Sequence, residues 1–405
     1  MSPGRPSCVV VVGIGADGWL GLPERLRALV SDADVVLGGR RHLSLLPTVN
    51  GQVREAWPSP LRDSLPAMLD RHAGRSVVAL ASGDPLLSGV GTTLVEMLGA
   101  DLVRVEPAVS SVALARARLC WSAESVEVLT LVGRDVDVVL RHLAPGQRLL
   151  LLSSDAETPA KIARLLADAG YADSNVVVLG DLGSPDESRT EGRAGSWSAE
   201  VPALNVIALE LAGPVLGSWV AGLPDTAYEH DGQLTKRDLR ASALARLAPQ
   251  PGQLLWDVGA GAGSVGIEWM RAHARCRAVA VEADHERADR ISRNAARLGV
   301  PGLRVVCGRA PEALHDLPEP AAVFVGGGAT RPGVVEACRH GLAPGGRLVV
   351  HGVTLETETL LVRAYDDFGG ELTRHSVDRA AALGDMTGWS PSRPVMQWAW
   401  TKEDS

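Results

Sequence analysis

Short runs of apolar residues recur along the first half of the chain, and stretches with helical spacing separate them. Runs that are apolar throughout, rather than alternating with polar residues, are typical of strands buried on both faces of a parallel sheet. Strands that alternate with helices indicate α/β layers. The strands predicted in this half are residues 9–12, 35–37, 77–80, 102–105, 125–131, 149–152, 176–179 and 204–209.

The second half repeats this alternation but closes differently. Two late strand patterns, residues 371–378 and 395–401, follow one another through a turn-rich connection. We expect them to form an antiparallel hairpin at the edge of a Rossmann-like sheet. The other predicted strands are residues 254–258, 278–281, 303–307, 322–325 and 347–350, with helices over 236–247, 264–274 and 285–298.

The length and the breaks in the pattern indicate two domains. A chain of 405 residues is too long for one ordinary domain. A strand pattern ends at Gly213-Pro214, and a polar stretch without periodicity follows over residues 225–231. We therefore predict domains over residues 1–212 and 213–405. Within the first, residues 106–111 form a plausible hinge between two lobes.

Charge and composition exclude several classes of function. Forty basic against 48 acidic residues give a net charge of -8, and aromatic residues make up 4%. Both values argue against a nucleic-acid partner. The five cysteines are scattered without metal-ligand spacing, as expected of reduced thiols in a cytoplasmic protein. We also expect no metal, no membrane span and assembly into a homo-oligomer.

A glycine-rich loop follows the strand at residues 254–258. Glycines let the backbone turn sharply and approach a ligand at a helix N-terminus. Glu282, at the tip of the next strand, is placed to accept hydrogen bonds from both hydroxyls of a ribose. Gly261, Gly263 and Gly266 also fit the dinucleotide pattern. Asp257 immediately before the loop, with the closing strand pair, favours S-adenosylmethionine instead.

Two segments of the first half carry candidate chemistry. Residues 13–18 spell a literal G-x-G-x-x-G, but the next strand ends in Arg40, Arg41 and His42 without a ribose-binding carboxylate. These cations are candidates for gripping carboxylates, or else a solvated helix start. Gly83 and Asp84, in a turn after a buried strand, either present backbone groups to a ligand in a cleft or serve as a structural turn.

Taken together, these segments resemble the fused precorrin-6Y C5,15-methyltransferases (decarboxylating) over nearly the whole chain. The run Gln233-Leu-Thr-Lys-Arg237 is especially specific. The segments that resemble a two-lobed tetrapyrrole methylase fold are 9–23, 33–47, 79–94, 107–119 and 204–211. Those that resemble a Rossmann-like class I methyltransferase are 222–241, 254–272, 306–314, 323–328 and 344–357.

The resemblance implies one S-adenosylmethionine per domain and a tetrapyrrole polycarboxylate as substrate. It assigns C5 methylation to the first domain, and C15 methylation with decarboxylation of the C12 acetate to the second. Gly83 and Asp84 carry over as the N-terminal cleft loop. The C-terminal cofactor contacts that carry over are Thr235, Gly259, Ala260, Gly261, Ala262, Gly263, Glu282 and Ala310.

The chain departs from the family pattern at two places. Val132 stands where the family usually has His, and His351-Gly352 stands where it usually has Asn-Ala. The first departure puts in doubt any role for that side chain in the first domain. The second changes the end of a sheet strand, near where substrate would lie.

No nucleophilic triad or paired-carboxylate signature is present, which fits a reaction that depends chiefly on positioning. Lys236, His351 and His230 are candidate acids or carboxylate anchors, with a surface or structural role as the alternative. Other candidates for a basic substrate pocket are Arg40, Arg41, Arg237, Arg309 and Arg331. The rival functions are an NAD-dependent oxidoreductase and an inactive methyltransferase-like scaffold.

Overall fold

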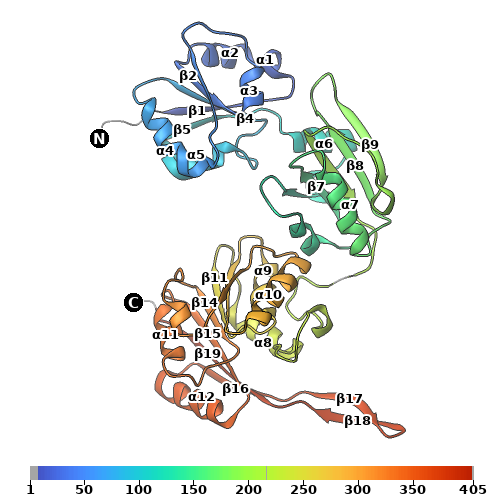
Figure 1. The fold of residues 1–405 in the computed structure, drawn as a ribbon, viewed down its shortest axis with the longest axis vertical. Helices are drawn as coiled ribbons and strands as arrows, with labels where there is room; N and C mark the ends of the chain where they lie inside the picture. Colours follow the sequence, from blue (N-terminus) through green and yellow to red (C-terminus); the bar gives the residue numbers. More distant parts are fainter. Residues whose placement is uncertain (1–7, 216, 404–405) are drawn as a thin grey trace. The chain divides into compact units, whose positions relative to one another are not determined.

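The computed structural model describes residues 8–215 and 217–403 and divides into two compact units (Figure 1). The first unit comprises Met1–Val136 and Ala144–Pro214, and the second comprises Asp137–Leu143 and Val215–Ser405. The short segment Asp137–Leu143 thus groups with the second unit, although it lies within the first half of the sequence. Short 3-10 helices span Ala100–Leu102, Ala123–Ser125, Val136–His142, Ala194–Ser196, Asp225–Ala227 and Glu312–Leu314.

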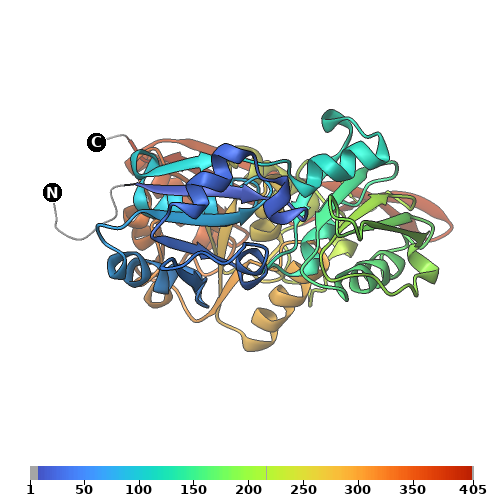
Figure 2. The same cartoon turned by 90° about the horizontal axis from the view of Figure 1, so that it is seen from above.

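The first sheet is parallel, with the strand order β3-β2-β4-β1-β5. Its strands lie side by side in both views (Figures 1 and 2). They are β1 (Val9–Ile14), β2 (Val35–Gly38), β3 (Val53–Ala56), β4 (Val77–Ser82) and β5 (Val103–Glu106). The helices are α1 (Gly18–Gly21), α2 (Glu24–Ser31), α3 (Arg40–Ser44), α4 (Leu61–Arg71) and α5 (Val90–Leu98). The sequence pattern missed β3, because this edge strand reads Val-Arg-Glu-Ala and has no apolar run.

The second sheet of the first unit is mixed, with the order β6-β7-β10-β8-β9. β10 runs antiparallel to both of its neighbours, so the expectation of a parallel sheet is wrong here. A continuous apolar run indicates that a strand is buried on both faces, but it does not indicate whether the strand runs parallel or antiparallel to its neighbours. The elements are β6 (Glu127–Thr130), β7 (Arg148–Leu152), β8 (Asn175–Gly180), β9 (Ser188–Arg193), β10 (Asn205–Glu210), α6 (Ser111–Leu119) and α7 (Thr158–Asp168).

The second unit contains one seven-stranded sheet, ordered β13-β12-β11-β14-β15-β19-β16. The first five strands are parallel, and β19 runs antiparallel to β15 and β16. This confirms the Rossmann-like sheet with an antiparallel edge. The strands are β11 (Leu254–Val258), β12 (Arg277–Glu282), β13 (Arg304–Cys307), β14 (Ala322–Val325), β15 (Arg347–Gly352), β16 (Glu371–His375) and β19 (Val395–Thr401).

The connection between β16 and β19 differs from the turn-rich segment that we expected. It is an antiparallel ribbon of β17 (Asp378–Leu383) and β18 (Met386–Pro391) that projects from the second unit (Figure 1). Leu383, Met386 and Trp389 are all more than two-thirds exposed on this ribbon. The small and polar residues around them gave no strand periodicity in the sequence.

Helices cover both faces of the seven-stranded sheet. Buried residues of α8 (Arg237–Leu247), α9 (Ser264–Ala272) and α10 (His285–Arg297) form a core with one face. Residues of α11 (Val334–Gly341) and α12 (Leu355–Phe368) form a core with the other. This packing leaves the loops at the carboxyl ends of the parallel strands free to line a site.

Among the described residues, no helix combines the length and apolarity needed to cross a membrane. The same residues contain no group of three or more His, Cys, Asp or Glu side chains arranged for a metal ion.

Candidate functional site

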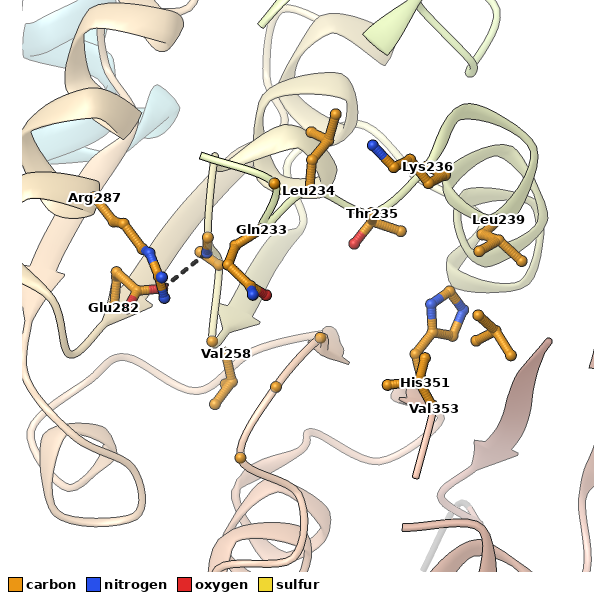
Figure 3. Close-up of a pocket in the computed structure, with 18 of the residues that line it drawn as sticks. Gln233, Leu234, Thr235, Lys236, Leu239, Val258, Glu282, Arg287, His351 and Val353 are labelled. Atoms are coloured by element: carbon orange, nitrogen blue, oxygen red, sulfur yellow. Dashed lines mark hydrogen bonds between the residues drawn. The ribbon is translucent and has the colours of Figure 1, made fainter. Parts of the chain in front are cut away.

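A cavity of about 780 Å³ opens at the carboxyl ends of the parallel strands of the second unit. The loops after β11, β12, β13 and β14 line it, together with the end of β15. Residues 232–236, which we call the strap, line the opposite side just before α8 (Figure 3). Residues of the β16–β19 connection complete the wall. This is the edge at which α/β sheets bind nucleotide-like ligands.

The glycine loop after β11 requires its glycines for steric reasons. Gly259, Gly261 and Gly263 have φ of +65°, +59° and +75°, where other residues are strained. A Cβ on Gly259 would lie 2.7 Å from the carbonyl oxygen of Gly327, and one on Gly261 would lie 2.7 Å from that of Gln233. The loop therefore packs backbone against backbone, on the strap at one side and on the β14 loop at the other.

Glu282 ends β12 beside this loop. Its Oε2 accepts a hydrogen bond from the Gly261 N–H at 2.8 Å, and its Oε1 accepts one from the Asp284 N–H at 3.1 Å (Figure 3). The residue is buried within the protein yet lines the cavity. A carboxylate has room for about four hydrogen bonds, so acceptor positions remain for two ligand hydroxyls.

Asp257 lies beneath the glycine loop and joins β11 to α9. Its Oδ2 accepts a hydrogen bond from the Gly266 N–H at 2.8 Å. Burial, with a smaller contribution from the nearby charge of Glu282, raises the pKa of this carboxyl group to about 7. Asp257 does not line the cavity, so its contact with Gly266 gives it a structural role.

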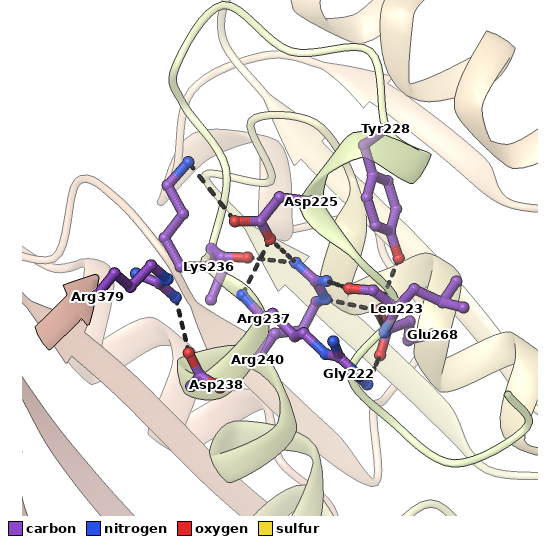
Figure 4. A network of polar contacts seen from close by, with 11 residues as sticks. Gly222, Leu223, Asp225, Tyr228, Lys236, Arg237, Asp238, Arg240, Glu268 and Arg379 are labelled. Atoms are coloured by element: carbon purple, nitrogen blue, oxygen red, sulfur yellow. Dashed lines mark hydrogen bonds and ion pairs between the residues drawn. The ribbon is translucent and has the colours of Figure 1, made fainter. Parts of the chain in front are cut away.

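The strap is held from below by Arg240, a fully buried residue of α8 (Figure 4). Its guanidinium donates hydrogen bonds to the carbonyl oxygens of Thr235 and Leu223. It also donates to Glu268 Oε1 at 2.6 Å and lies 3.4 Å from Asp225 Oδ1. Arg240 thus connects the strap to the segment that precedes it and to α9.

Glu268 is the centre of this buried network. Its carboxylate also accepts hydrogen bonds from the N–H groups of Gly222 and Leu223 and from the Tyr228 hydroxyl, the last at 2.8 Å. Burial raises the pKa of Tyr228 well above its usual value, and the charge of Glu268 adds to this effect. The Arg240 guanidinium lies 4.8 Å from the centre of the Tyr228 ring.

The other end of the strap is held at the surface. Asp231 pairs with Arg287 at 2.8 Å and with Arg290 at 3.2 Å, both on α10. The hydrogen bond from Arg287 is the main reason why the pKa of Asp231 lies well below its usual value. Arg287 also lines the cavity next to Glu282 (Figure 3). The strap therefore has a buried attachment at one end and a half-exposed one at the other.

His351 ends β15 on the wall of the cavity. Its Nε2 lies 2.9 Å from Oε1 of the buried Gln397, and its ring meets Phe324 edge-on at 4.9 Å between centres. Burial lowers the pKa of His351 to about 4, so the ring is neutral at physiological pH. A neutral ring offers no charge to a substrate carboxylate.

The structure brings most of the C-terminal residues expected from the sequence to one cavity. Lys236, the residue before α8, lines it with its Nζ 3.8 Å from Asp225 Oδ2. Arg331 lines it while paired with Glu312 at 3.3 Å. The other expected residues on the wall are Thr235, Gly259, Ala260, Gly261, Glu282, Arg309, Ala310 and His351.

Four expected residues lie outside the cavity wall: Ala262, Gly263, Arg237 and His230. Ala262 is buried behind the loop, where its carbonyl accepts a hydrogen bond from Asn294 at 3.0 Å. Gly263 precedes α9, and a Cβ there would press on Ile291. Both residues shape the turn rather than its ligand-facing surface. Arg237 and His230 flank the strap instead of lining the cavity.

Sequence reasoning missed several residues on the wall. Arg287 comes from α10, and His375, Arg379 and Arg393 come from the closing strands and the ribbon. In the sequence, the only indication of a role for this closing segment is its positively charged residues, such as Arg379 and Arg393. The antiparallel insertion of β19 between β15 and β16 returns this segment to the cavity, and only the folded sheet shows it.

In the first unit, the loops after β1, β4 and β5 pack closely. The Gly83 carbonyl accepts a hydrogen bond from the Ala108 N–H at 3.1 Å, and the Gly83 N–H donates to the Ile14 carbonyl at 3.0 Å. A Cβ on Gly13 would lie 2.0 Å from the Gly83 oxygen. Asp84 Oδ1 accepts from the Leu86 N–H at 2.9 Å, as in an Asx turn.

The basic cluster of the first unit has internal partners. Arg41 donates through Nη2 to Ser82 Oγ at 3.1 Å and lies 3.0 Å from His42 Nε2. Burial lowers the pKa of His42 to about 4. Arg40 begins α3 at an exposed position. Both arginines are exposed, but Arg41 is held beside β4 by its hydrogen bond to Ser82.

Two family models match the chain. Tetrapyrrole (corrin/porphyrin) methylases match residues 8–197, and the precorrin methyltransferase domain matches residues 226–402. Both describe methyltransferases, so the oxidoreductase alternative is wrong. The two-lobed methylase fold expected for the first half and the methyltransferase fold expected for the second are confirmed.

Relatives resemble either the whole chain or about half of it. A Sinorhizobium precorrin-6Y C(5,15)-methyltransferase [decarboxylating] is 44% identical over 97% of this chain and 96% of its own length. A probable cobalt-precorrin-6B C(15)-methyltransferase (decarboxylating) of Pyrobaculum calidifontis is 35% identical over 43% of this chain and 92% of its own. A cobalt-precorrin-7 C(5)-methyltransferase of Salmonella typhimurium is 31% identical over 44% and 87%.

Proposed function

Because the chain belongs to the family of precorrin-6Y C5,15-methyltransferases (decarboxylating), we propose that its two units divide that family's reactions between them. The enzyme transfers two methyl groups to a tetrapyrrole precursor of cobalamin and removes the carboxylate of its C12 acetate. We assign C5 methylation to residues 1–212, and C15 methylation with decarboxylation to residues 213–405. Two half-length relatives whose names divide these reactions in the same way support the assignment.

The second unit binds S-adenosylmethionine in the cavity beside the glycine loop. The observation that carries this proposal is the placement of Glu282 and the Gly259–Gly261 backbone at one edge of the sheet. Glu282 accepts hydrogen bonds from both ribose hydroxyls. Thr235 contacts the cofactor from the strap, and Ala310 contacts it from the loop after β13. Ala262 and Gly263 act indirectly, because they hold the turn in place.

The first unit binds a second molecule of S-adenosylmethionine near Gly83 and Asp84. The close packing of the loops after β1, β4 and β5 supports this proposal, because it leaves backbone groups at the carboxyl edge of a parallel sheet. Arg41, held beside Ser82, is placed to contact a substrate carboxylate. Arg40 is the weaker candidate, because no comparable hydrogen bond holds its side chain among the described residues.

The cavity of the second unit also has the charge that a polycarboxylate requires. Arg309 and Arg393 line it without an ion-pair partner among the described residues, and Lys236 and Arg379 add two further cations. An acidic chain thus gathers positive charge where the substrate would bind. Arg237 does not line the cavity, so we propose that it affects substrate binding only indirectly, as the residue that follows the strap.

The chemistry needs little from the protein beyond position. S-adenosylmethionine supplies an activated methyl group when bound. The attacking ring carbon gains the methyl group and loses its proton, while the decarboxylated acetate loses carbon dioxide and gains a proton. The protein holds the reactants in line and excludes water. Lys236 stays a candidate proton donor, since its amine lies on the cavity wall.

Titration with S-adenosylhomocysteine tests the proposal of one cofactor per unit. The full chain should bind two equivalents and no NADH. Glu282→Ala should remove one equivalent and Asp84→Ala should remove the other. A single equivalent in the unaltered chain would contradict the proposal.

We further propose that the enzyme forms a homo-oligomer, acts in the cytoplasm and has no nucleic-acid partner. The ribbon supports self-association, because it leaves the apolar side chains of Leu383, Met386 and Trp389 exposed, and a second copy that covered them would remove apolar surface from water. Light scattering of the purified chain tests this, and a monomeric mass would contradict it.

A further inference from the structure

The imidazole of His351 presents one ring nitrogen to the cavity and buries the other. Nε2 lies 2.9 Å from Gln397 Oε1. Nδ1 has no hydrogen-bond partner among the described residues, and the ring lies on the cavity wall across from Thr235 (Figure 3). The residue is only 8% exposed and lines the cavity.

Gln397 determines which nitrogen of His351 carries the proton. An amide oxygen only accepts hydrogen bonds, so His351 must donate from Nε2. In the orientation that the structure shows, Gln397 Nε2 donates to Ser242 Oγ at 3.3 Å. Ser242 Oγ in turn accepts from Arg246 at 2.8 Å and lies 3.4 Å from His375 Nε2. His351 Nδ1 is therefore left with a lone pair facing the cavity.

The surroundings keep this ring neutral. Arg246 on α8 and His375 on β16 both disfavour a second proton on His351, and burial does so more strongly. Glu371, an acidic side chain at the start of β16, pairs with Arg246 at 3.0 Å. The cavity thus contains a neutral hydrogen-bond acceptor among several cations.

The substrate offers a limited set of donors to such an acceptor. A tetrapyrrole polycarboxylate at neutral pH carries acetate and propionate groups, which are acceptors and pair with arginines. Its strong donors are the N–H groups of the ring. A neutral acceptor on this wall therefore suits a ring N–H and does not suit a carboxylate.

We propose that His351 Nδ1 accepts a hydrogen bond from a ring N–H of a metal-free tetrapyrrole and so positions the macrocycle for the reaction of the second unit. The inference rests on the proposed function. A metal ion in the macrocycle replaces these N–H hydrogens, so the same contact favours the metal-free substrate over its metal-loaded form. His351 is a positioning residue, with Gln397 as the group that keeps its lone pair directed inward.

Steady-state kinetics of C15 methylation with His351→Leu and His351→Asn test this proposal in the full chain. His351→Leu should lower kcat/KM for the metal-free tetrapyrrole by about tenfold, the usual size for one neutral hydrogen bond. His351→Asn should retain most of it. Affinity for S-adenosylhomocysteine should be unchanged in both variants. Equal kcat/KM for the unaltered chain and His351→Leu would overturn the proposal.

A zinc-loaded tetrapyrrole of the same ring provides the second readout. The unaltered chain should prefer the metal-free ring, and His351→Leu should lose that preference. Gln397→Leu should lose the preference as well, because nothing then holds the proton of His351 on Nε2. This variant replaces His351→Leu as the test if His351→Leu fails to fold. A preference that survives in the folded variants would overturn the proposal. Absence of any product from the unaltered chain would instead contradict the proposed function.

Discussion

Glu282 shows how one side chain can stabilise a loop and serve a ligand together. It accepts hydrogen bonds from the N–H groups of Gly261 and Asp284, and further acceptor positions remain for a ribose. Glu282→Gln preserves the shape but removes the charge and one acceptor oxygen. We expect S-adenosylhomocysteine affinity at one of the two sites to fall roughly 10- to 100-fold, as for charge-assisted hydrogen bonds. Calorimetry measures this, and two unchanged sites would contradict it.

Asp257 makes stability depend on pH in the direction opposite to an ordinary salt bridge. The unfolded carboxyl titrates near 3.8 and the folded one near 7, so between these values the folded state holds a proton that the unfolded state has lost. The free energy of unfolding therefore falls as pH rises through this window. Asp257→Asn keeps an acceptor for Gly266 but cannot ionise.

Denaturant unfolding at pH 5 and at pH 8 measures this. From pH 5 to pH 8, we expect the free energy of unfolding to fall less for Asp257→Asn than for the unaltered chain. The variant should gain most at pH 8, where the buried charge is fully formed in the unaltered chain. Asp34→Asn is the control, because it changes an exposed carboxylate of the other unit, just before β2, whose pKa is lowered from its usual value of 3.8. That group is ionised in both the folded and the unfolded state between pH 5 and pH 8, so this variant should leave the pH slope unchanged. An identical pH slope for Asp257→Asn would contradict the account.

At the scale of elements, the strap depends on its buried attachment. Arg240→Met removes the donors to Thr235, Leu223 and Glu268 and leaves the Glu268 carboxylate buried with fewer partners. Breaking such a pair costs about 3–5 kcal/mol. We expect a lower Tm and at least tenfold weaker S-adenosylhomocysteine binding at one site, measured at a temperature where the variant is folded.

Tyr228→Phe is the matched control for this prediction. It removes one hydrogen bond to Glu268 but none to the strap. We expect a lower Tm with both cofactor sites intact. If both variants weakened cofactor binding in proportion to their loss of stability, Arg240 would be a merely structural residue.

The elements also show how far the sequence predicts the structure. Strands with apolar runs, such as β1 and β11, follow from their residues because burial on both faces needs nothing else. β3 and β9 lie at sheet edges and are polar, so no local pattern marks them. Every residue of β17 and all but one of β18 are exposed, so the ribbon lacks the alternation that a half-buried strand would show.

The candidate site was predictable to the extent that it is local in sequence. The glycine loop, Glu282 and the strap are contiguous segments whose chemistry is visible in their residues. Arg379 and Arg393 come to the same cavity from more than 100 positions beyond the loop, through the antiparallel return of β19. The neutral state of His351 likewise follows from its burial in the folded sheet, which the sequence does not show.

At the scale of the whole molecule, one chain carries two methyltransferase folds with separate cores. If each unit holds its own cofactor and catalyses its own reaction, the unit left intact should keep its methylation. We expect Glu282→Ala to retain C5 methylation of a substrate already methylated at C15. A labelled-methyl donor and NMR of the product measure it, and loss of C5 methylation would contradict the division of labour.

The central claim is that this single chain performs both methylations and the decarboxylation. The most direct test is incubation of the purified chain with precorrin-6Y and S-adenosylmethionine, followed by mass spectrometry of the product. The account predicts a product that has gained two methyl groups and lost one carbon dioxide. A product with one methyl group, or with two and no loss of carbon dioxide, would contradict it.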